Sequence, residues 1–104
     1  MQLFPVKDPG ESVVLSFDMS ADLPTGVTLT GVPNVTVSVL EGTDPSPSSI
    51  LNGGSSLDSS LTMVLQPVFG GVSGTLYEVK ATCNTTQSTI VLVLAGALPV
   101  RNAQ

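Results

Sequence analysis

Charged residues are scarce in this chain, and positively charged ones are the scarcest. The 104 residues include eight Asp or Glu and three Lys or Arg, which gives a net charge of −5. Three cations cannot line a phosphate backbone, so we expect no nucleic-acid binding, and the acidity argues against an anionic membrane surface. Ser, Thr, Gly and Pro replace the missing charges, and a surface of hydroxyls and backbone loses little on desolvation against another protein.

Histidine is absent, and Cys83 is the single cysteine. A disulfide within the chain is therefore excluded, a structural zinc site lacks its ligands, and a cysteine nucleophile lacks a histidine to activate it. We expect Cys83 to be a small buried hydrophobe at the end of a strand.

The carboxylates fall mostly in turns, where Asp caps its own backbone. No spacing brings two of them together for acid–base catalysis, so we expect no enzymatic activity, no catalytic residue and no cofactor. A calcium site at one end of the molecule stays open as an alternative, formed by Glu41 and Asp44 with Asp18 or Asp22, although their spacing matches no calcium-binding loop.

Long hydrophobic runs are also missing. The longest apolar stretch, Ile90–Val100, is interrupted by Gly96 and Pro99 and is shorter than the roughly 20 residues that a membrane-spanning helix needs. The N-terminus has neither the basic region nor the apolar stretch of a signal peptide. We expect a protein that is made in a cytoplasm and stays soluble there until it assembles.

The most informative stretch is Gly70–Leu94. It opens with Gly70, Gly71 and Gly74, which allow tight turns at no steric cost. Alternation then places Tyr77, Val79, Ala81 and Cys83 on one face of a strand. A polar turn at Asn84–Ser88 leads into the apolar run Ile90–Leu94, so a long hairpin is predicted.

Other segments repeat this pattern of short strands and turns. Further strands are predicted at Gln2–Val6, Ser12–Ser20, Val27–Leu29, Asn34–Leu40 and Leu61–Val68. In the last of these, Leu61, Met63 and Leu65 share one side and Pro67 ends the strand. Glu41–Ser49 and Asn52–Ser60 are turn and loop material, with Ile50 and Leu51 touching the core between them. Residues 1–104 thus form one domain, with Met1–Val6 and the loosely held tail Ala95–Gln104 as candidate arms.

No segment has a helical period, so we predict an all-β fold, an immunoglobulin-like β-sandwich of about seven antiparallel strands. Tyr77 supports this prediction, because it occupies the place of a tyrosine corner, whose hydroxyl returns to nearby backbone. The alternative is a half-buried strand aromatic.

The run Ile90–Leu94 is apolar on both faces, whereas a strand with one face in water should alternate. Either a loop covers the outer face or another polypeptide does. In the second case an interface would contain Phe4 and Phe69, the two aromatics not predicted to point inward, with Ile90, Val91, Leu92, Val93 and Leu94. Because sugar sites on β-sandwiches use exposed aromatics, a carbohydrate-binding or adhesion module is a weaker alternative.

Three motifs carry a resemblance to a known family: Lys7-Asp8-Pro9, Asp18-Met19-Ser20, and the Gly70–Val79 stretch GGVSGTLYEV. The chain resembles, over roughly residues 6–100, small tailed-bacteriophage proteins with an immunoglobulin-like sandwich, the fibre–tail adaptor-like proteins. It departs from them at Met19, where relatives commonly carry Trp, and at Thr86-Gln87, where they tend to have Gly-Arg.

The resemblance implies a non-enzymatic structural protein of the virion, assembled in the host cytoplasm. Such a protein joins the tail or neck to tail fibres in symmetric rings of copies, and its partners are tail tube, nozzle or portal-proximal subunits and fibre proteins. A capsid decoration or head–tail junction protein is the alternative, because such domains recur at several virion positions.

Overall fold

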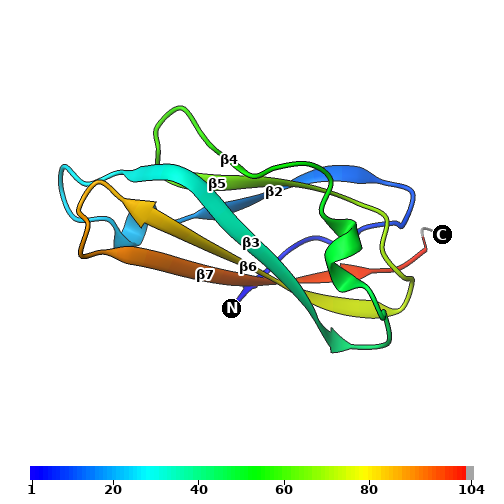
Figure 1. Cartoon of the computed structure of the whole chain (residues 1–104). Coiled ribbons are helices and arrows are strands. Elements are labelled where there is room, and N and C mark those ends of the chain that lie inside the picture. Colours follow the sequence, from blue (N-terminus) through cyan, green and yellow to red (C-terminus); the bar gives the residue numbers. More distant parts are fainter. Residues whose placement is uncertain (103–104) are drawn as a thin grey trace.

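The computed structural model describes residues 1–102 and folds them into two β-sheets that pack face to face (Figure 1). No α-helix occurs in this part of the chain, and the two helical turns are 3-10. In chain order the elements are β1 (Gln2–Leu3), β2 (Ser12–Asp18), η1 (Ser20–Asp22), β3 (Leu29–Glu41), η2 (Pro47–Ile50), β4 (Ser56–Leu57), β5 (Met63–Phe69), β6 (Thr75–Thr85) and β7 (Val91–Val100).

One sheet has the strand order β1-β7-β6-β3 and the other has the order β2-β5-β4. All neighbours pair antiparallel except β1, which runs parallel to β7. The result is an elongated body of 45 × 22 × 21 Å. The predicted all-β class is confirmed.

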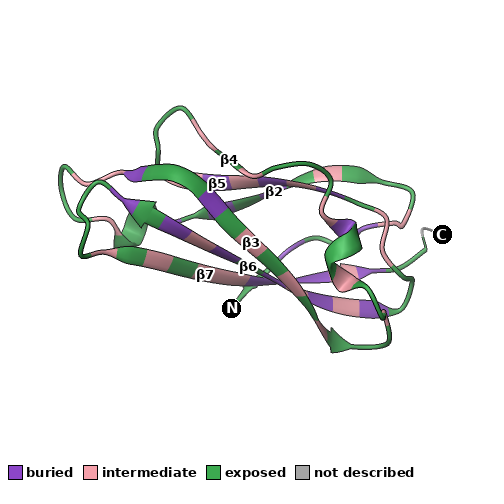
Figure 2. Ribbon diagram, viewed as in Figure 1, coloured by how far each residue is buried: buried purple, intermediate pink, exposed green. Residues whose placement is uncertain are grey.

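The core lies between the sheets and follows the alternation of β2 and β6. Leu15, Phe17 and Met19 at the β2 end, and Tyr77 and Val79 in β6, are at most 4% exposed. In Figure 2 buried residues appear as purple bands that recur along the strands of both sheets. Here one face of each strand meets the core, so a period of two in the sequence translates directly into burial.

β3 is longer than its sequence predicts. The sequence predicts two short strands, Val27–Leu29 and Asn34–Leu40, but a single strand runs from Leu29 to Glu41 through Gly31 and Pro33. The register against β6 shifts between Thr30 and Asn34, so these residues form an irregularity within the strand rather than its end. β3 lies at the edge of its sheet, where a proline's missing N–H is tolerated.

The side of β5 that faces the core is the opposite of the one suggested by Leu61, Met63 and Leu65. Val64, Gln66 and Val68 are the buried residues. The buried Gln66 amide has hydrogen-bond partners, because its Nε2 donates to Pro67 O at 2.8 Å and to Gly53 O at 3.1 Å. The bond to Gly53 holds part of the Asn52–Ser60 segment against β5. This segment also contains β4, which pairs with β5, so it is not simply a loop.

Two further prolines lie inside strands: Pro67, predicted to end its strand, and Pro99, which falls in the predicted C-terminal tail. Pro67 accepts a hydrogen bond from Asn52 N and Pro99 accepts one from Lys7 N. A residue's N–H and C=O point to the same side of a strand. Each proline therefore turns its missing donor away from its long neighbour, β2 or β6, and the ladder continues.

The predicted C-terminal tail is therefore mostly strand. β7 continues to Val100, and Leu98 and Val100 are buried. Residues 103–104 of the predicted tail lie outside the described residues.

The N-terminal segment is docked, and Phe4, expected to be exposed, is 5% exposed. Its ring packs edge-on against Phe17 with the centroids 5.3 Å apart, and its N–H donates to Ala97 O. Gly96 makes this possible, because a Cβ there would lie 2.3 Å from Phe4 Cε2. The sequence signal for this contact is thus a glycine far away in the chain.

Candidate protein-binding surface

β7 offers a row of apolar side chains to solvent on the outer side of its sheet. Leu92 and Leu94 pack against the core, so Val91 and Val93 point the other way and are 52% and 51% exposed. In Figure 2 this part of β7 alternates between green and pink. Within residues 1–102, therefore, no loop covers Val91 or Val93.

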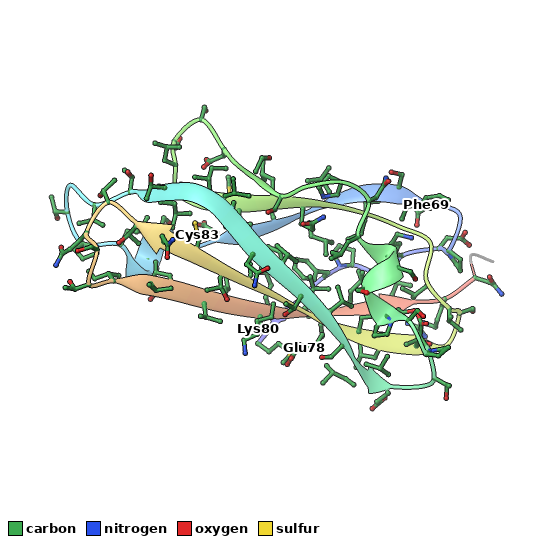
Figure 3. All side chains as sticks on the ribbon, viewed as in Figure 1. Phe69, Glu78, Lys80 and Cys83 are labelled. Atoms are coloured by element: carbon green, nitrogen blue, oxygen red, sulfur yellow. The ribbon has the colours of Figure 1, made fainter. Side chains whose placement is uncertain are left out.

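The cross-strand neighbours of this row are polar. On the same face, β6 places Asn84 opposite Val91, Thr82 opposite Val93 and Lys80 opposite Ala95. Figure 3 shows Lys80 and Glu78 extending away from the other sheet. We define the β7 face as the residues on the outer side of this sheet. They are Leu3, Val91, Val93, Ala95 and Ala97, of which Ala97 is only 8% exposed, together with the β6 residues Glu78, Lys80, Thr82 and Asn84.

The β7 face is apolar at its centre and carries few charges. Leu3, which is 73% exposed, pairs with Ala97 and extends the apolar row onto β1. Small and β-branched residues form its centre, and the hydroxyl, amide and two oppositely charged side chains of β6 line one side. Such a surface buries apolar area while few charges need desolvation.

The structure separates the residues that the sequence suggested as one interface. Val91 and Val93 lie on the β7 face, whereas Leu92 and Leu94 point into the core and Ile90 precedes the strand. Phe4 is buried, at 5% exposed, and is not part of the β7 face. Phe69 is half-exposed but belongs to β5 in the other sheet.

Lys7 is a buried cation beside Phe69 that sequence reasoning missed. Its side chain is 2% exposed, and its ammonium donates to Gly70 O at 2.7 Å and Asp8 O at 3.0 Å. The ammonium lies 5.7 Å from the centre of the Phe69 ring. Burial lowers the pKa of Lys7, against the opposing effect of Glu11 and Asp8. A basic residue in a turn gives no sequence signal of burial.

Tyr77 is fully buried at the glycine-rich corner, so the alternative of a half-buried aromatic is wrong. Its hydroxyl accepts from Val72 N at 2.9 Å and donates to Asp44 Oδ2 at 2.7 Å. Burial and the bond to Asp44 raise the pKa of Tyr77. This network joins three segments and is structural.

The three glycines that were predicted to form tight turns all have positive φ, at +79° for Gly70, +103° for Gly71 and +88° for Gly74. Gly71 is the most constrained, because a Cβ there would also lie 3.2 Å from both Val100 methyl groups.

The acidic residues considered for calcium do not meet. Asp18 ends β2 beside Met63, at the end of the molecule where β3 begins, since Leu29 N donates to Leu61 O. Glu41 ends β3, at the far end of that strand. Within residues 1–102 no group of three or more His, Cys, Asp or Glu side chains could hold a metal ion.

Cys83 is buried, as predicted, and 2% exposed. Burial raises the pKa of its thiol, so it is a hydrophobic filler in β6. No helix in the described part of the chain has the length and hydrophobicity to cross a membrane.

Comparison of the chain with protein-family models, with curated proteins and with solved structures finds no match.

Proposed function

We propose that this chain is an immunoglobulin-like structural protein of a tailed-bacteriophage virion, an adaptor that joins the tail or neck to tail fibres through protein–protein contacts. The resemblance of its Lys7-Asp8-Pro9 and Gly70–Val79 motifs to fibre–tail adaptor-like proteins is the origin of the proposal. The observation that carries its central element, a surface for protein contact, is the uncovered β7 face.

The strand order supports the immunoglobulin-like assignment. An immunoglobulin sandwich has strands A, B, E and D in one sheet and C, F and G in the other. Here β2-β5-β4 corresponds to B-E-D and β7-β6-β3 to G-F-C, with β1 added beside G. The hydrogen bond from Val72 N to the Tyr77 hydroxyl, at the start of the F-equivalent strand, agrees with a tyrosine corner.

The aromatic residues favour a protein partner over a sugar. Phe4, Phe17 and Tyr77 are at most 5% exposed, which leaves Phe69 as the one aromatic with a half-exposed ring. A single ring offers little stacking surface for a carbohydrate. The β7 face, in contrast, would bury its apolar side chains against a protein partner without needing aromatic residues.

The first test is substitution on the β7 face. Val91→Asp and Val93→Asp should leave unfolding free energy within about 1 kcal/mol of the parent, because both side chains are half in water, and should abolish assembly into particles. Val32→Asp is the matched control, since Val32 is 85% exposed on a different strand, and should assemble normally. Recovery of both β7 variants as unfolded protein, or normal assembly of both, would contradict the role of this face.

The second test is location. The mass of the purified protein in solution is measured first, and the chain is then labelled in intact particles. A stable monomer found in rings at the tail vertex supports the adaptor function. Label over the whole shell would replace it by the capsid decoration alternative, and absence from particles would overturn the virion assignment.

A further inference from the structure

Four strands form the edges of the two sheets, and three of them are blunted against further pairing. β1 and β4 are two residues long, and Pro5 follows β1 closely. β3 contains Pro33 and two register shifts. Short edges, prolines and bulges are the devices by which proteins prevent edge-to-edge association.

β2 is the exception. It runs for seven residues in unbroken register with β5 and contains no proline, glycine or lysine. Its one charged residue, Asp18, stands at its end, and Val14 in its middle is 58% exposed. An edge of this kind is a template for another strand.

The pairing shows which backbone groups β2 offers. Val14 stands opposite Pro67, which has no N–H and whose carbonyl is bonded to Asn52, so this is a pair without mutual hydrogen bonds. The N–H and C=O of Val14 therefore point away from β5, and those of Ser12 and Ser16 do the same. The contact from Gln2 Nε2 to Ser16 O, at 3.2 Å, agrees with this direction and is solvent-exposed.

An apolar groove of about 380 Å³ runs along this edge. Phe4, Pro5 and Val6 form one wall and Val13, Val14 and Leu15 form the other. The groove lies between the two sheets' edge strands. Alternate side chains of a strand added to β2 would therefore enter it while the backbone pairs with Val14 and Ser16, as in recognition by strand addition.

The charges decide between possible occupants. Glu11 lines the groove and is exposed, and its Oε1 accepts a hydrogen bond from Asp8 N at 2.7 Å. Lys7 also lines it, but its ammonium is engaged with Gly70 O and Asp8 O. A second copy of the chain would bring a further net charge of −5, whereas a segment with a Lys or Arg near Glu11 would be complementary.

We propose that β2 accepts an extended segment of another protein by strand addition, with alternate apolar side chains in the groove and a basic residue near Glu11. This surface is distinct from the β7 face. The inference does not depend on the proposed virion function, and its test uses the isolated protein.

The experiment is selection of a displayed random-peptide library on the full chain, with counter-selection on Val14→Pro. Proline at residue 14 removes an N–H that faces away from β5, so the sheet is expected to survive. Val14→Thr retains the N–H and is the matched control. We expect enriched peptides with alternating apolar residues and a Lys or Arg, bound at least about tenfold more weakly by Val14→Pro than by Val14→Thr, a difference of roughly 1.4 kcal/mol.

A second measurement requires no protein variant. Selected peptides are N-methylated at one amide at a time, and methylation at alternate positions should abolish binding, because only one edge of an added strand donates to β2. The same binding should protect the amide of Val14 from hydrogen exchange.

Three outcomes would overturn the inference. They are the absence of peptides that distinguish Val14→Pro from Val14→Thr, sensitivity to N-methylation without alternation, and a dimer in solution that Val14→Pro dissociates. The last would assign the edge to a second copy.

Discussion

Replacing Gly96 by alanine should destabilise the protein out of proportion to the one methyl group that it adds. The new Cβ would lie 2.3 Å from Phe4 Cε2 and 2.8 Å from its Cζ, distances that real Cβ atoms essentially never show, and 3.1 Å from its Cδ2. Phe4 must shift or leave. Overpacking of a core by one group costs about 1–3 kcal/mol.

Full expulsion of Phe4 sets an upper limit. It would expose a side chain whose burial contributes about 1.5–3 kcal/mol and break the edge contact with Phe17, worth about 0.5–1.5 kcal/mol. Together these bracket the cost of Gly96→Ala at about 1–4.5 kcal/mol.

A double-mutant cycle separates this steric cause from others. Phe4→Ala alone should cost about 3–5 kcal/mol, but in that background Gly96→Ala should be neutral or slightly stabilising, because the methyl enters the vacated space and alanine orders the strand better than glycine. The coupling energy should therefore exceed about 1 kcal/mol.

The assay is urea denaturation monitored by far-UV circular dichroism, a signal that requires no tryptophan. Gly54→Ala is the control, since a Cβ at residue 54 meets nothing within 4 Å, and it should change stability little. Additive effects of Gly96→Ala and Phe4→Ala, or a Gly96→Ala variant as stable as the parent, would refute the docking of Phe4 over Gly96.

Three further predictions follow from single contacts. Tyr77→Phe should lower unfolding free energy by about 1–3 kcal/mol, because Val72 N–H loses its acceptor and Asp44 its donor; a loss below about 0.5 kcal/mol in urea titration would contradict this role. Hydrogen bonds from the Met63 and Thr62 amides lower the pKa of Asp58 below 3.8, so the stabilisation is complete above that pH and lost as pH falls through the lowered pKa. The melting temperature of Asp58→Asn should lie below that of the parent at neutral pH and approach it in acid, and a constant gap would refute the linkage. Cys83 should react with a thiol reagent far more slowly than the thiol of the urea-unfolded chain, because the thiol is buried and its pKa raised; equal rates would show that β6 is open there.

The fold class could be predicted from the sequence because β2 and β6 each turn a single face to the core. Where that condition fails, prediction fails as well. Both faces of β5 are largely apolar, and Gln66 suggested that its own face was the outer one. Its buried position depends on carbonyls of Gly53 and Pro67, which no periodicity reveals.

The prolines and Gly96 led to wrong strand ends and to a wrong position for Phe4 for a related reason. Their effect depends on which side of a strand needs a donor and on what lies above the backbone. Pro67 and Pro99 turn their missing N–H away from the long neighbouring strand, and Gly96 leaves room for Phe4. These are relations between segments distant in the chain, so local propensity cannot contain them.

Of the two candidate surfaces, the sequence suggested the β7 face but not the edge of β2. The apolar run in β7 suggested an interface, and Val91 and Val93 are indeed exposed. The open edge of β2 was not suggested, because its sequence reads as an ordinary half-buried strand and its lack of a second neighbour is a property of topology.

The order of strands in the sheets has a kinetic consequence. β2 pairs with β5 and β3 with β6, so most of the structure joins segments that are far apart along the chain. The one long pairing between consecutive strands is the β6–β7 hairpin. Closing long loops before native contacts can form slows folding, typically to milliseconds or seconds for such topologies. Folding is thus expected to start at the hairpin. β2, which has one edge unpaired even in the finished sheet, can associate with other chains for as long as folding lasts.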